Sequence, residues 1–286
     1  MRFRALMLAL ATALVVFVFG FAAGDADEVL TVNHPKVKSV IEVQEAVTPD
    51  LMAIEDVLGT AVAQDDDGEI TIVVYVNLEG KNPGKTYKDI PDEIRGVRTR
   101  AEITEPFRAM KGKPGGVSHT AKQTPPIQLG TSGGWGYDSA NGYCCSGTLG
   151  SLVQINGVQY ILSNYHVLEA HTGSGGGPVI QPGLVDVNCS ANEDNTNVVA
   201  TLSGIKSLPG SNVDAAIAPV SAGMVREDGA ILEIGTISAT TVPASLHQAV
   251  KKSGRTTGLT RSKVKGLNGT VSVVYDNECG GLPAFV

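Results

Sequence analysis

His166 is the histidine in this sequence whose position best suits acid–base chemistry. It stands where the apolar segment YILSNYHVLE runs out, whereas His34, His119 and His247 lie in polar or strand-flanking settings that suit surface or structural roles. Imidazole is the side chain whose ordinary pKa suits proton transfer near neutral pH. A structural histidine with both ring nitrogens hydrogen-bonded would fit the same position, and position alone leaves both interpretations open.

Asp214 is the second candidate, at the entrance of the apolar segment NVDAAIAPV. Burying a carboxylate at the start of such a segment is costly unless it accepts hydrogen bonds or faces a cation. A histidine imidazolium is one such partner, and an aspartate in this role holds a catalytic histidine in the required tautomer. The alternative is an aspartate that caps a turn after Asn212.

Short strands are expected to position these side chains. Within residues 147–168, two apolar runs flank Asn156 and Gly157, the pair that favours a two-residue hairpin turn with positive φ at both positions. The second run leads directly to His166. Repeated short strands separated by glycine-rich turns are typical of a sandwich or barrel. Further strands are expected within residues 197–205, 212–220, 247–254 and 268–275.

Together these segments resemble the trypsin/chymotrypsin-like serine peptidases, most closely the bacterial secreted proteins related to the plant Narrow Leaf peptidase. The matching stretches are CCSGTLGSLV, YILSNYHVLE, NVDAAIAPV and VKKSGRTTGLTRSKV, and the resemblance is strongest over residues 142–275. It implies a mainly β fold with a trypsin-like double β-barrel. It also implies hydrolysis of a polypeptide substrate without metal or organic cofactor, with His166 as general base and Asp214 orienting it.

The family's nucleophile is a serine in a Gly-Asp-Ser-Gly segment, and no such segment occurs in the 286 residues. Ser174, in GSGGGP, precedes Asp214, whereas chymotrypsin-type chains run His, Asp, Ser. Too few residues follow the histidine strand to build the oxyanion-hole turn around Ser174. Ser253 matches a strand position instead. We therefore identify no nucleophile, and expect an incomplete second barrel and no turnover by the chain as given.

Three interpretations follow from the missing serine. The chain is a truncated or frameshifted copy of a secreted peptidase, or a catalytically inactive homologue that acts as a binding protein, or an enzyme that has recruited Ser174. A fluorophosphonate probe separates the third interpretation from the other two, because it labels only an activated serine: labelling at Ser174 would exclude both non-catalytic interpretations, and no labelling would exclude recruitment.

Residues 30–110 predict a separate small α+β domain. Apolar residues recur at helical spacing over residues 35–47. A second helix is expected over residues 48–59, with Thr48 as its cap and Pro49 in its first turn. No catalytic constellation is evident in this domain.

Strands complete the same domain. Residues 69–76 are β-branched and almost wholly apolar, which indicates a central strand, and residues 97–103 alternate as a half-exposed strand does. The acidic turn at residues 65–67 is expected to be a solvated hairpin tip rather than a calcium loop. Residues 111–126, rich in Lys, Gly and Pro, predict a linker to a second unit spanning residues 127–286.

The first 24 residues predict a secretory signal. Arg2 and Arg4 precede the apolar run 5–23, and small residues follow. An uncleaved anchor is the alternative, since the run is nearly long enough to span a bilayer. Cleavage changes the net charge from −7 to about −9, which disfavours nucleic-acid binding. We expect a secreted, periplasmic or cell-surface protein without stable membrane association.

Four cysteines, Cys144, Cys145, Cys189 and Cys279, are available for disulfides in an oxidising compartment. Neighbouring cysteines rarely meet disulfide geometry with each other. The first two are therefore expected to bond to the last two, in either order. A zinc site is the alternative, but the sequence lacks the C-x-x-C spacing of such sites.

Overall fold

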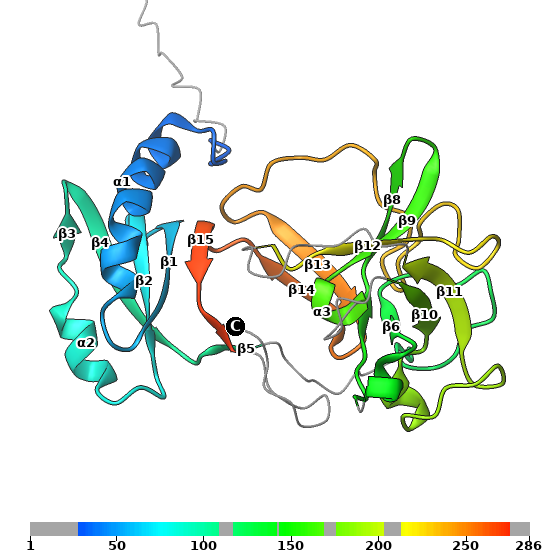
Figure 1. The fold of residues 1–286 in the computed structure, drawn as a ribbon. Helices are drawn as coiled ribbons and strands as arrows, with labels where there is room; N and C mark the ends of the chain where they lie inside the picture. Colours follow the sequence, from blue (N-terminus) through cyan, green and yellow to red (C-terminus); the bar gives the residue numbers. More distant parts are fainter. Residues whose placement is uncertain (1–27, 109–116, 142, 169–175, 203–212, 275–286) are drawn as a thin grey trace, which may run out of the picture.

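The computed structural model of the chain is mainly β, with the helices concentrated in the first unit (Figure 1). The expected signal at residues 1–24 lies outside the described residues. No helix in the described part of the chain is long and apolar enough to cross a membrane. The structure describes residues 28–108, 117–141, 143–168, 176–202 and 213–274.

The elements fall into two groups along the chain. The first comprises α1 (Pro35–Met52), β1 (Val57–Gln64), β2 (Ile70–Asn77), α2 (Pro83–Asp89), β3 (Glu93–Ile94), β4 (Val97–Thr104) and β5 (Phe107–Arg108). The second comprises β6 (Thr131–Trp135), η1 (Asp138–Asn141), β7 (Gly147–Leu149), β8 (Ser151–Ile155), β9 (Val158–Ser163), α3 (Tyr165–Leu168), β10 (Gly177–Gln181), η2 (Leu184–Val187), β11 (Asn197–Leu202), β12 (Ala216–Pro219), β13 (Ala249–Gly254) and β14 (Gly258–Lys263). Two short strands follow, β15 (Leu267–Val271) and β16 (Val273–Val274).

One helix, α1, replaces the two that the sequence predicted, so the predicted helix over residues 48–59 is wrong. Thr48 does not cap a new helix, because its hydroxyl donates to the Gln44 carbonyl within α1. Pro49 lies in the last turn of α1, where its missing N–H removes only one hydrogen bond and the helix ends soon after. The end of the predicted helix lies instead in β1, which is buried along almost its whole length.

The first unit is built on a five-stranded sheet of order β15-β1-β2-β4-β3. As predicted, β2 is central: it pairs antiparallel with β1 and parallel with β4, and α2 lies on the connection between β2 and β4. The acidic turn is a hairpin tip, in which the Asp65 carboxylate accepts from the backbone of Glu69 and from Arg98. Figure 1 shows α1 across the sheet, and its apolar face lies in the core there.

Strand β15 belongs to this first sheet, which corrects the prediction that residues 127–286 form only the second unit. It pairs antiparallel with β1, and β16 pairs in parallel with β5 (Figure 1). Leu246 and Leu267 lie in the core of the first unit. The Gln44 amide donates to the Asn268 carbonyl at 3.1 Å. The physical reason is that β1 is buried and its outer edge needs a partner strand.

Residues 117–126 are packed against the second unit, so the predicted linker does not extend over them. His119 is fully buried, with its ring nitrogens 2.9 Å from the Gly130 carbonyl oxygen and 2.7 Å from the Glu233 carboxylate. The sequence around His119 is polar and lacks a hydrophobic period, so it did not predict this burial. The burial depends on hydrogen-bond partners that are distant in sequence, such as Glu233. Residues 111–116 of the predicted linker lie outside the described residues.

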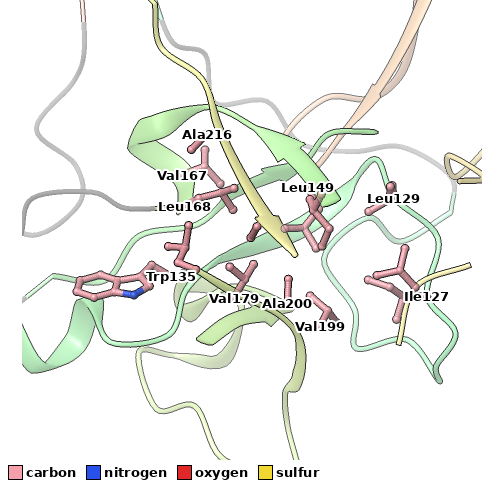
Figure 2. Close-up of a cluster of buried hydrophobic side chains, with 14 of the residues drawn as sticks. Ile127, Leu129, Trp135, Leu149, Val167, Leu168, Val179, Val199, Ala200 and Ala216 are labelled. Atoms are coloured by element: carbon pink, nitrogen blue, oxygen red, sulfur yellow. The ribbon is translucent and has the colours of Figure 1, made fainter. Parts of the chain in front are cut away.

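The second unit contains a four-stranded sheet, β11-β10-β6-β7, a three-stranded sheet, β12-β9-β8, and the two-stranded ribbon β13-β14. The predicted hairpin is confirmed: β8 and β9 pair antiparallel around Asn156 and Gly157, whose φ angles are 51° and 81°. Apolar side chains from both larger sheets share one core, including Leu149, Val179 and Ala216 (Figure 2). No sheet closes into a barrel through strand pairing among the described residues.

The cysteine prediction is confirmed in part. Cys144 and Cys189 form a disulfide with a Cα–Cα distance of 5.3 Å, so the neighbouring cysteines do not pair with each other. Cys145 is also disulfide-bonded. Cys279 lies outside the described residues. The bridge fixes the segment before β7 to the turn that follows η2.

Gly59 permits the close approach of β15, because a Cβ there would run into the Thr270 carbonyl oxygen and lie 2.8 Å from Val271 Cγ1. We expect Gly59→Ala to lower the free energy of unfolding by about 1–3 kcal/mol, the usual cost of displacing packed groups. Hydrogen exchange of the β1 and β15 amides should also become faster. Gly84→Ala is the matched control, since a Cβ there meets nothing within 4 Å. Equal stability of the two variants would show that β15 does not press on β1.

Candidate active site

The register of β9 against β12 brings the two catalytic candidates together. Ser163 at the end of β9 lies opposite Ala216 at the start of β12. Because the strands are antiparallel, residues just after β9 meet residues just before β12. The chain leaves β9 at Asn164 and turns at once into α3, which carries His166, while Asp214 precedes β12 by two residues.

The side chains of His166 and Asp214 are hydrogen-bonded, with Nδ1 of the ring 2.6 Å from Oδ2 of the carboxylate. The other carboxylate oxygen, Oδ1, accepts from the backbone N–H of His166 at 3.2 Å. The Asn164 amide donates to the Asp214 carbonyl at 3.0 Å and to Oδ2 at 3.3 Å. Three donors therefore hold the carboxylate in one orientation against the ring.

This contact determines what the ring can do. An ionised carboxylate only accepts hydrogen bonds, so Nδ1 of His166 carries the hydrogen, and Nε2 is the ring nitrogen that takes up a proton. When it does, the adjacent carboxylate stabilises the imidazolium. The His166 side chain is 44% exposed and that of Asp214 31% exposed, so a reactant can approach the ring. Chemically, such an arrangement is able to act as a general base with its orienting group.

Other described histidines occupy the settings expected of structural or surface residues. His119 is enclosed, with an acceptor at each ring nitrogen, and cannot reach a reactant. His34 accepts from a backbone N–H at the start of α1 and contacts Glu28. His247 contacts the Gln64 side chain at 2.9 Å. The exposed ring of His166 differs from the enclosed ring of His119, which argues against a packing role for His166.

Several other site predictions can now be placed. Ser174 lies outside the described residues. Ser253 is in β13, where its hydroxyl lies 3.4 Å from His119 Nδ1 and 3.4 Å from the Gly130 carbonyl oxygen, as expected for a strand residue. His, Cys, Asp and Glu nowhere gather in threes, as a metal site requires, among the residues that the structure describes. The sequence analysis did not identify Asn164 as a residue of the site. Its position immediately after β9, two residues before His166, was the signal in the sequence that could have identified it.

The GRTTG segment has a role that its sequence did not reveal. Arg255 donates to both oxygens of Asp186 at 2.7 Å, and both side chains are largely buried. Ser132 donates to the same carboxylate at 2.5 Å, and the Arg255 backbone N–H donates to the Thr148 hydroxyl. These contacts fix the turn between β13 and β14 to β6, β7 and η2.

Asp138 is a second buried carboxyl, and no described Lys, Arg or His forms an ion pair with it. Its side chain is almost fully buried, and no described group hydrogen-bonds to Oδ1. Burial raises the pKa of Asp138 to about 6, because the apolar surroundings disfavour the ionised form. The carboxyl therefore changes its protonation between mildly acidic and neutral pH.

No protein-family model matches the chain, and no curated protein matches it. The geometry around His166 is therefore the principal evidence for what the site does.

We expect His166→Ala to lower the free energy of unfolding by only about 1 kcal/mol or less, since partly exposed ionic pairs contribute little to stability. Arg255→Ala should cost about 3–5 kcal/mol, because it leaves Asp186 buried and unpaired. Urea unfolding of both variants measures the difference. Comparable losses would mean that His166 is a structural residue.

Asp138 should make stability depend on pH. The carboxyl keeps its proton to a higher pH in the folded protein than in the unfolded chain. Its contribution to the free energy of unfolding is therefore fully present below about pH 4 and declines as the pH rises through about 6. Between about pH 4 and pH 6, we expect the free energy of unfolding of the wild type to fall by up to about 2 kcal/mol relative to that of Asp138→Asn, as measured by urea unfolding at each pH. Asp50→Asn, at an exposed position of α1, is the control and should retain the wild-type slope. An unchanged slope in Asp138→Asn would contradict the assignment.

Proposed function

We propose that this protein is a secreted serine endopeptidase of the trypsin-like type, with His166 as general base and acid and Asp214 as its orienting carboxylate. The observation that carries the proposal is the 2.6 Å contact between Nδ1 and Oδ2 in a half-exposed setting. A contact of this kind supplies the tautomer and the charge stabilisation that nucleophile activation needs.

In the proposed reaction, Nε2 of His166 takes the proton of a serine hydroxyl as its oxygen attacks the substrate carbonyl. The imidazolium then donates this proton to the leaving amine, which gives an acyl-enzyme and the first product. Water deacylates the enzyme by the same proton route in reverse. Asp214 stays ionised throughout and stabilises the imidazolium. The serine is expected in a Gly-Asp-Ser-Gly segment, which is not among the 286 residues.

We also propose that the two larger sheets of the second unit form the first barrel of a trypsin-like double barrel. Two features support it. Gly150 alone separates β7 from β8, so the two sheets adjoin there. At the other side, Ala200 in β11 bridges to Val220 just after β12, and the Ser221 N–H donates to the Val199 carbonyl. In this proposal β13 and β14 open the second barrel.

The alternative function is a catalytically inactive homologue that binds a partner. This function applies when no Gly-Asp-Ser-Gly segment occurs anywhere in the protein, and none occurs in the 286 residues. The two functions differ in one chemical respect, because only the peptidase contains a serine that is activated by His166.

The test is to sequence the coding DNA through and beyond the Val286 codon, and to treat the natural secreted product with a fluorophosphonate before intact-mass analysis. We expect one serine outside the present 286 residues to be labelled. Peptide hydrolysis should fall about a million-fold in His166→Ala and about ten-thousand-fold in Asp214→Ala. His247→Gln is the control and should retain activity, since the hydrogen bond of its ring in the described residues is to Gln64.

Each other outcome contradicts the proposal. A true stop after Val286 with no labelling would favour the binding protein. Labelling at Ser174 would mean that this loop serine had been recruited. Labelling elsewhere that persists in His166→Ala would remove His166 from the reaction.

A further inference from the structure

The chain between β12 and β13 includes a run of consecutive exposed residues, 236–244, that belong to no helix or strand. Figure 1 shows this connecting segment arching from the second unit towards the first before the chain enters β13. Its sequence, TISATTVPA, contains no charged side chain. Ile237 and Val242 are 49% and 69% exposed, so apolar side chains face solvent as well as small ones.

The connecting segment is anchored just before it begins and just after it ends. Upstream, the Gly235 N–H donates at 2.8 Å to the carbonyl of Ile231, which lies in the core of the second unit. Downstream, Leu246 lies in the core of the first unit, and its N–H donates to the Leu30 carbonyl at 3.0 Å. Between these points, residues 236–244 form no backbone–backbone hydrogen bond with a described residue. Local opening of the connecting segment therefore costs little free energy.

A second exposed loop, residues 188–194, shows what the connecting segment lacks. Its Cys189 is joined to Cys144 by a disulfide. The Asn192 side-chain oxygen accepts from two backbone N–H groups that follow it, at 2.9 and 3.1 Å. The Lys122 ammonium donates to two backbone carbonyls of the loop. Exposure alone is therefore not what distinguishes the connecting segment.

These features are those of a site for proteolysis. Exposed stretches of small and polar residues with few backbone hydrogen bonds are where native proteins are preferentially cut. Residues 227–250 contain no Lys or Arg, so a peptidase that requires a basic side chain has no bond to cut there. Ala239 and Ala244 instead suit a peptidase with a small specificity pocket, as in elastase.

A cut in the connecting segment would leave both units assembled. The piece after the cut contains β15, which pairs with β1, and β16, which pairs with β5. It also contains Arg255, whose guanidinium is hydrogen-bonded to both oxygens of Asp186. His166 and Asp214 both belong to the piece before the cut, so the contact between them does not cross it.

We propose that the connecting segment is a processing site, at which a separate peptidase that accepts small aliphatic side chains hydrolyses the bond after Ala239 or Ala244. Water supplies a hydroxyl to the alanine carbonyl carbon and a hydrogen to the nitrogen of the next residue as the C–N bond breaks. The product is a two-chain protein whose pieces are held together by strand pairing and by the Arg255 ion pair. The proposal does not depend on peptidase activity of this chain, since the cutting enzyme is a separate protein.

The test is to treat the full chain with elastase and, separately, with trypsin, and to determine the cut positions by intact mass. We expect elastase to produce a new amino terminus at Thr240 or Ser245, and trypsin to leave residues 227–250 uncut. The elastase pieces should co-elute in size-exclusion chromatography at the position of the uncut protein and separate in urea. The chromatography is repeated with dithiothreitol, because Cys279 lies in the second piece and a disulfide to it would also join the pieces.

Two double variants test the position of the cut. Ala239→Asp/Ala244→Asp places a carboxylate at each proposed position, and the cut should become about tenfold slower or more, because a small apolar pocket rejects a charge. Ser190→Asp/Ala191→Asp adds the same charge to the second exposed loop and should be cut as fast as the wild type. Circular dichroism checks that both variants are folded.

Absence of a cut within residues 236–244, or an undiminished rate in Ala239→Asp/Ala244→Asp, would overturn the processing site. Pieces that separate without urea would overturn the two-chain product even when the cut occurs. Separation on reduction alone would also overturn it, because a disulfide rather than strand pairing would then join the pieces.

Discussion

The register of β9 against β12 is the constraint on which the candidate site depends. Because Ser163 lies opposite Ala216, the chain leaves β9 beside the point where it enters β12. Nδ1 of His166 therefore lies 2.6 Å from Oδ2 of Asp214. A shift of one residue would carry every side chain of β12 to the other face and remove buried Ala216 and Ala218 from the core. Core packing thus fixes the geometry of an exposed polar pair.

A second constraint joins the two units. Residues 264–266 connect β14 directly to β15, which completes the first sheet, while Arg255 ties the turn before β14 to Asp186 in the second unit. The ribbon is therefore held by a different unit at each end. The sheet of residues 28–108 is therefore completed by a strand, β15, that follows the second unit in the sequence. A role for the first unit must account for this shared strand.

Local signals predicted local features well. Asn156 and Gly157 predicted the β8–β9 hairpin and its turn, and the apolar run after the acidic turn predicted the central strand β2. The pairing of His166 with Asp214 was predicted from the resemblance to a known family, which rested on the order of the motifs along the chain. What failed was non-local: β15 in the first sheet, the burial of His119 and the salt bridge of Arg255 each depend on a partner distant in sequence. Hydrophobic period contains no information about such partners.

We propose that Asp214 fixes His166 as a base that acts through Nε2, and the tautomer of the His166 ring tests this role most directly. Nitrogen-15 NMR of the full chain with labelled histidine, assigned with His166→Ala, distinguishes the two neutral tautomers. We expect a hydrogen on Nδ1, with a downfield proton resonance that is lost in Asp214→Ala. A hydrogen on Nε2 in the neutral ring, unaffected by Asp214→Ala, would show that Asp214 does not orient the ring and would leave His166 without a catalytic role.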